Sequence, residues 1–179
     1  MLKLCNLFIL VFLMSCSQAS KEDLTGVFGL NIGKQIPEKY LDSKTAEYPT
    51  RILSLKVKPN DEMNIFESFM VQIIESDKTV YSIIAEKEYD NPATCNLAFQ
   101  DLYELLNEKY EHLKQTREIN VGSKVIYTDD GYKSSNGRNY LRFGCSVDEN
   151  GINRLDLSLW DTELQIKAEK LWSKFTAKK

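Results

Sequence analysis

Apolar and polar residues alternate in the first half of the chain in a way that is typical of β-strands. Residues 53–58 carry apolar side chains at every second position, the pattern of a strand with one buried face. Residues 66–74 and 79–85 are apolar at most positions, so they predict a hairpin near the centre of a sheet. These segments predict an antiparallel meander, and a shorter strand is expected within residues 27–33.

Two later segments have the spacing of amphipathic helices. Asn91 is a favourable N-cap and Pro92 suits the first helical position, while Asp161 and Thr162 can cap a second helix. The first apolar stripe consists of Phe99, Leu102, Tyr103, Leu106, Tyr110 and Leu113. The second consists of Leu164, Ala168, Leu171, Trp172 and Phe175. We expect each stripe to face a core.

More strands are predicted between the two helices. Residues 124–128, 139–147 and 152–160 have strand patterns, and the polar residues 148–151 predict a tight hairpin between the last two. The order is β-rich, helix, β-rich, helix. The fold class is therefore α+β, with a mainly antiparallel sheet and two amphipathic helices.

The beginning of the chain has a different character. Lys3 precedes an uninterrupted apolar stretch at residues 7–14, which is the order of a secretory signal. A bilayer-spanning helix needs about 20 apolar residues, so this stretch is too short to be a permanent anchor.

The residues that close this stretch, Leu13, Met14, Ser15 and Cys16, resemble the lipobox of bacterial lipoproteins. The resemblance implies that the chain is cut before Cys16, whose sulfur is diacylated and holds the protein at a membrane. An aspartate after that cysteine tends to retain such proteins at the inner membrane, and here the residue is Ser17. The implied location is the cell envelope, at the periplasmic face of the outer membrane. The alternative is an ordinary cleaved signal in which Cys16 is incidental.

We therefore divide the chain into a signal peptide at 1–15, a lipidated N-terminus and tether at 16–23, and a single α+β domain at 24–179. A flexible tether of this length reaches only about 15 Å, which keeps the domain close to the membrane. The formal net charge of −3 and the absence of blocks of like charge argue against nucleic acid as a partner.

The four cysteines differ in their expected roles. Cys5 falls within the signal and Cys16 carries the lipid, which leaves Cys95 and Cys145. Cys95 lies four residues before Phe99 on the helical stripe, and Cys145 lies on the apolar face of its strand. For an exported protein this predicts a disulfide that joins helix to sheet. The alternative is two buried free thiols.

Candidate catalytic groups are few. The only histidine, His112, follows the helical stripe and is best interpreted as a partly exposed residue at a helix end. Zinc sites with several His or Cys ligands are excluded, and we predict no metal and no cofactor. A nucleophile elbow and phosphate-binding glycine loops are absent from the sequence. Trp160 and Trp172 fit the apolar faces and are predicted to be core residues.

The polar run at residues 128–139 is long for a hairpin turn, and long loops often bind partners. The predicted protein-contact loop contains Asp129, Asp130, Tyr132, Lys133 and Arg138. A simple connector is the alternative.

These observations favour a non-enzymatic, lipid-anchored module that binds a protein, such as an inhibitor or an immunity-type protein. One alternative is an accessory or structural subunit of an envelope assembly or transport complex. Another is a hydrolase that uses paired carboxylates, since many Asp and Glu residues are available.

Overall fold

The structure is a computed structural model that describes residues 23–41, 47–56, 59, 65–110, 117–121, 125–134 and 136–178. For 117–121 and 125–132 it describes the backbone only. The predictions that lie outside the described residues concern the signal peptide, Cys16 with its tether up to residue 22, the end of the strand at 57–58, His112 and Leu113.

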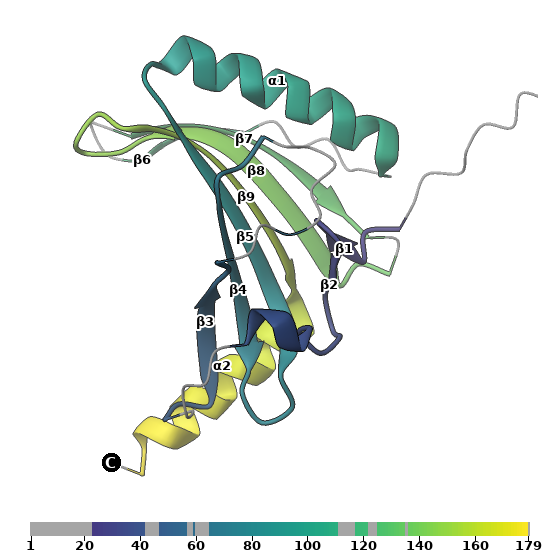
Figure 1. The fold of residues 1–179 in the computed structure, drawn as a ribbon. Coiled ribbons are helices and arrows are strands. Elements are labelled where there is room, and N and C mark those ends of the chain that lie inside the picture. The colour runs from purple at the N-terminus through teal and green to yellow at the C-terminus, as the bar shows by residue number, and fades with distance from the viewer. Residues whose placement is uncertain are drawn as a thin grey trace, which may run out of the picture.

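The described residues form a seven-stranded antiparallel sheet in the order β3-β4-β5-β9-β8-β7-β6 (Figure 1). The strands are β3 (Thr50–Ser54), β4 (Ser68–Ile74), β5 (Thr79–Tyr89), β6 (Arg117–Val121), β7 (Val125–Lys133), β8 (Asn139–Val147) and β9 (Asn153–Asp161). A separate two-stranded sheet pairs β1 (Gly26–Val27) with β2 (Leu30–Asn31). The predicted α+β class is confirmed.

Two meanders meet at the centre of the large sheet. Strands β3, β4 and β5 form the first meander as predicted, and β6 to β9 form the second. They join because β9 pairs antiparallel with β5, which places Leu159 opposite Ile83. Both strands are therefore flanked on each side, which fits their rich content of buried apolar residues.

Both α-helices begin where the sequence predicts. Helix α1 (Pro92–Lys109) starts after Asn91, whose Oδ1 accepts a hydrogen bond from the Thr94 N–H at 3.0 Å. Helix α2 (Thr162–Thr176) starts after Asp161, whose Oδ1 accepts from the Leu164 N–H at 2.9 Å. A short 3₁₀ helix, η1, covers Glu38–Tyr40. Neither α-helix is long and apolar enough to cross a membrane.

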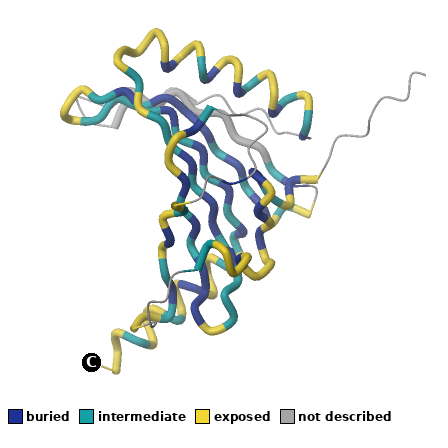
Figure 2. The backbone as a smooth tube through the Cα atoms, in the orientation of Figure 1, coloured by how far each residue is buried: buried dark blue, intermediate teal, exposed yellow. Residues whose placement is uncertain are grey.

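One face of the large sheet, which we call the inner face, packs against α1 and carries the core. Buried and partly buried residues alternate along the central strands (Figure 2). Helix α1 crosses this face, and the β1–β2 hairpin lies on the same side (Figure 1). The largest fully buried side chains are Phe66, Phe143, Leu24, Ile73, Ile74, Ile83, Leu102, Leu106, Leu141, Leu155 and Leu157. Cys95 of α1 and Cys145 of β8 form the predicted disulfide, with their Cα atoms 6.1 Å apart.

The opposite, outer face carries Trp160, so the prediction that Trp160 is a core residue is wrong. In β9 the residues Leu155, Leu157 and Leu159 are all fully buried, and strand alternation sends Trp160 to the other side. Trp172 is also not a core residue, because 37% of it is exposed on α2. Only part of the predicted apolar stripe of α2 is covered by the rest of the protein, and Ala168 is the only buried residue on this helix.

Candidate functional site on the outer face

The prediction that residues 129–133 form part of a contact loop is wrong, because they lie in a strand. Asp129, Asp130, Tyr132 and Lys133 belong to strand β7, which pairs with β8 from Tyr127 to Lys133. Only Arg138 lies in the turn between the two strands. Residues 129–133 are mostly polar, which is unusual for a strand, but they pair with the more apolar strand β8.

Arg138 has a structural role within the chain. Its Nη2 lies 2.9 Å from Asp161 Oδ2 and 3.1 Å from Glu163 Oε2. The turn that carries Arg138 is closed by Asn136, whose Oδ1 accepts from the Arg138 N–H at 2.9 Å and from the Ser134 hydroxyl at 2.8 Å. These contacts fix the start of α2 against the β7–β8 turn.

Lys133 belongs instead to a row of side chains across the outer face. Its Nζ lies 5.1 Å from the centre of the Tyr140 ring, and Tyr140 stacks on Trp160 with ring centres 5.8 Å apart and an interplanar angle of 15°. The register continues this row from Trp160 to Ser82 on β5 and Gln72 on β4. An aromatic pair beneath a cation is thus held on a rigid sheet.

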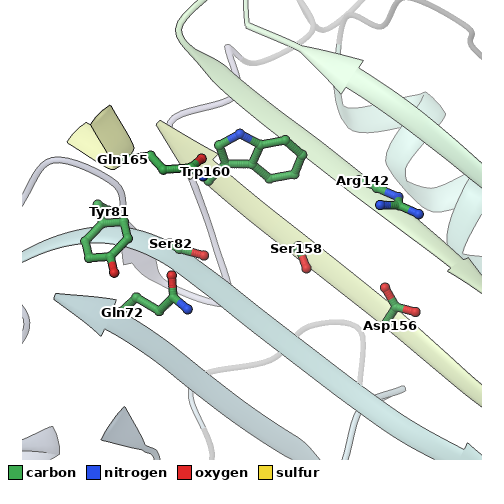
Figure 3. A pocket seen from close by; sticks show the side chains of 8 residues that line it. All are labelled: Gln72, Tyr81, Ser82, Arg142, Asp156, Ser158, Trp160 and Gln165. Atoms are coloured by element: carbon green, nitrogen blue, oxygen red, sulfur yellow. The ribbon is translucent and has the colours of Figure 1, made fainter. Parts of the chain in front are cut away.

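Beside this row the outer face contains a hollow of about 490 Å³ (Figure 3). We call it the outer hollow, and its lining side chains are Gln72, Tyr81, Ser82, Arg142, Asp156, Ser158, Trp160 and Gln165. They come from β4, β5, β8, β9 and the first turn of α2. Arg142 and Asp156 lie at one end, Trp160 and Gln165 lie at the other, and Ser158 lies between them.

A β-bulge explains why two consecutive residues of β5 line the outer hollow. The register shifts so that Gln72 faces Ser82 while the next residue, Ile73, faces Val80. Tyr81 is the extra residue on β5. Tyr81 and Ser82 therefore both reach the outer side, where regular alternation would allow only one of them.

The Tyr81 phenol is held at the junction between the sheet and α2. Burial raises the pKa of Tyr81 above its ordinary value of 10.0; a hydrogen bond with Thr50 lowers this pKa, and the carboxylate of Glu169 raises it. The net shift is upward, so the phenol stays protonated well above neutral pH and remains available as a hydrogen-bond donor.

A cluster of exposed apolar side chains lies next to the outer hollow, where β3 meets α2. Trp172 stacks on Tyr48 with ring centres 5.3 Å apart, and both contact Phe175 edge-on. Ile52 lies two residues along β3 from Thr50, whose hydroxyl accepts a hydrogen bond from Trp172 Nε1. We call Tyr48, Ile52, Trp172 and Phe175 the aromatic patch.

The aromatic patch is unusually exposed for its composition. Tyr48 is 46% exposed, Ile52 is 61% exposed and Trp172 is 37% exposed. Three of the six large hydrophobic residues found exposed in the described part of the chain are therefore gathered in one place.

Glu75, a buried carboxylate near the same end of the sheet, is compensated within the chain. Its Oε2 lies 3.1 Å from Arg51 Nε, and its Oε1 contacts Lys78 Nζ. Among the described residues no group of three or more His, Cys, Asp or Glu side chains is arranged to hold a metal ion.

Comparison with known proteins gives no assignment for this arrangement. No protein-family model matches the chain, and no curated protein or solved structure shows a significant similarity to it.

Sequence reasoning missed both surfaces. The position of Trp160 could have been recognised, because it follows three leucines of opposite parity in the same strand. The aromatic patch had no sequence signal, since Tyr48 and Trp172 are far apart along the chain and meet only when α2 packs against β3.

Proposed function

We propose that this protein is a lipid-anchored, non-enzymatic module of the cell envelope that binds another protein through the aromatic patch. An inhibitor or immunity-type role is the most specific form of this proposal. The observation that carries it is the gathering of Tyr48, Ile52 and Trp172 on one exposed surface.

The composition of the patch supports a protein partner. Trp and Tyr are enriched among the residues that contribute most to protein–protein affinity, and contiguous exposed apolar surface marks interaction sites. The patch is also organised before binding, because Trp172 is stacked on Tyr48 and hydrogen-bonded to Thr50. A side chain that is already ordered loses less conformational entropy when a partner binds.

The position of the patch fits a protein anchored at Cys16. In Figure 1 the first described residues, which lead into β1, lie on the right side of the molecule, and the end of α2 lies at the lower left. A short tether before β1 would leave α2 and the aromatic patch on the side away from the membrane. A partner could approach this side without contacting the bilayer.

An affinity pull-down from envelope extract tests the proposal with three proteins. Wild type should recover a partner, the Tyr48→Ala/Trp172→Ala variant should lose it, and Leu97→Ala should retain it. Leu97 is the matched control, because it is a 67% exposed apolar residue on α1, remote from the patch. Equal recovery by all three proteins would contradict docking through the patch.

The mass of the purified complex then separates the two non-enzymatic roles. An inhibitor should form a one-to-one complex with its partner, whereas an accessory subunit should co-purify with a larger membrane assembly. Light scattering of the recovered complex distinguishes these outcomes.

A further inference from the structure

We infer that the outer hollow binds a neutral sugar ring, as part of a glycan that contains pyranose units. This inference goes beyond the proposed protein docking and uses different residues. It rests on the size of the hollow, the functional groups that line it and the geometry of Trp160.

The outer hollow has the dimensions of a ligand site. Its volume of about 490 Å³ falls within the range of roughly 300–1,000 Å³ that is typical of small-molecule pockets. Its lining comes mainly from four strands of one sheet, which hold side chains more rigidly than loops do. The bulge at Tyr81 adds a hydroxyl that regular pairing would direct away from this face.

The polar groups in the hollow match a ligand rich in hydroxyl groups. Gln72 and Gln165 each present an amide, and Ser82 and Ser158 each present a hydroxyl. Amides and hydroxyls can both donate and accept hydrogen bonds, as the hydroxyls of a sugar do. A ligand with donors only or acceptors only would leave half of this capacity unused.

Trp160 supplies the apolar surface that a sugar ring requires. Its indole is steadied by the stacked Tyr140 ring, and it borders the hollow at the end nearest Gln165. The face of an indole carries partial negative charge, which attracts the partly positive C–H groups on the flat side of a pyranose. A rigid aromatic ring beside several amides and hydroxyls is therefore complementary to a pyranose.

The charges in the hollow argue against other ligand classes. Arg142 and Asp156 lie at the same end and have opposite charges, so the lining as a whole does not favour an anion or a cation. Trp160 and the Tyr81 ring are the main apolar groups in the lining, too few for a lipid tail. Asp156 is the only carboxylate in the lining, whereas glycoside hydrolysis generally needs two, so we infer binding without cleavage.

The two tryptophans of the chain make a direct test possible, because one borders the hollow and the other belongs to the aromatic patch. The Trp172→Phe variant keeps Trp160 as its only indole, and its fluorescence is titrated with maltotriose and with tri-N-acetylchitotriose. At least one trimer should change the emission in a saturable way. Adding Gln72→Ala and Gln165→Ala should weaken the affinity by about tenfold or more.

The control for this titration is Ile166→Ala in the same Trp172→Phe background, because Ile166 is an exposed apolar residue of α2 outside the hollow. It should bind as tightly as the parent variant. If neither trimer gives saturable binding, or if the two glutamine substitutions leave the affinity unchanged, the sugar site is disproved.

A measurement on the unmodified protein keeps the test independent of the Trp172→Phe substitution. Amide–proton correlation spectra of the wild type contain two indole signals, and the bound trimer should move the Trp160 signal and leave the Trp172 signal in place. Movement of the Trp172 signal alone would overturn the assignment. The pull-down tests the aromatic patch separately, because its variants Tyr48→Ala/Trp172→Ala and Leu97→Ala change no residue that lines the hollow.

Discussion

Cys95 on α1 and Cys145 on β8 are bonded across a sequence separation of 50 residues, and both lie in the core between helix and sheet. The bond fixes the only long helix on the inner face to one of the central strands of the described sheet. Among the described residues, the α-helix that packs at the outer side is α2, at one end of the sheet.

Removal of this bond should destabilise the protein without changing its fold. Closing a loop of about 50 residues stabilises a protein by about 4 kcal/mol in the chain-entropy model. We expect the Cys95→Ala/Cys145→Ala variant to lose a free energy of unfolding of this order in urea denaturation. Wild type treated with reductant should unfold at nearly the same urea midpoint as the variant. If both unfold at the midpoint of the oxidised wild type, the disulfide does not contribute to stability.

Asp161 should be more important than its position at a strand end suggests, because its two oxygens serve different partners. Oδ1 accepts from the Leu164 N–H as the helix cap, and Oδ2 pairs with Arg138. Asp161→Ala should lower the free energy of unfolding by about 1–3 kcal/mol, since it removes a cap and a buried acceptor. Asp161→Asn retains an acceptor for the cap and should recover part of that loss. Equal thermal stability of both variants and the wild type would contradict this assignment.

The local features of the fold were predictable from sequence. Both α-helices follow from a cap residue and a 3.6-residue apolar period, and the β8–β9 hairpin follows from alternation on both sides of the turn at 148–151. The Cys95–Cys145 bond was predictable because each cysteine shares a periodic apolar face. Each of these signals is contained within a few turns or one hairpin.

Features that depend on distant pairing were not predictable. Strand β9 lies beside β5 although a helix and three strands separate them in sequence, and no local pattern encodes this neighbour. The first part of β7 falls within the strand predicted at 124–128, but its second part has the composition of a loop, because residues 129–133 are mostly polar. Pairing with β8 overrides that composition. The outer hollow depends on the pairing of β5 with β9, so it could not be found before the sheet order was known.

The lipid anchor remains a prediction from the resemblance of residues 13–16 to a lipobox, and it has a direct test. Cys16→Ser removes the sulfur that would be acylated and the residue before which the signal would be cut. We expect this variant to accumulate as a longer precursor that incorporates no labelled fatty acid, as judged by its mobility and by metabolic labelling. Cys5→Ser is the matched control, because it lies within the signal and should leave processing intact. Normal maturation of the Cys16→Ser variant would show that the signal is of the ordinary cleaved type.

The ionisation of Tyr81 should make the stability of the protein depend on pH in the alkaline range. Burial raises the pKa of this phenol in the folded state above the ordinary value of 10.0, so the folded state favours the protonated form. The resulting stabilisation is complete below the unfolded pKa and is lost as pH rises through the folded pKa.

Comparison with Tyr81→Phe isolates this effect. The variant lacks both the ionisable hydroxyl and its hydrogen bond with Thr50. Below the unfolded pKa, loss of the hydrogen bond changes the free energy of unfolding by an amount that does not depend on pH. The free energy of unfolding of the wild type should therefore fall relative to that of the variant as the pH rises from the ordinary tyrosine pKa of 10.0 through the higher pKa of folded Tyr81. The difference in phenolate absorbance between the wild type and Tyr81→Phe reports the titration of Tyr81 directly. If the midpoint of this difference lies at or below the ordinary tyrosine pKa, Tyr81 is not held protonated beside α2.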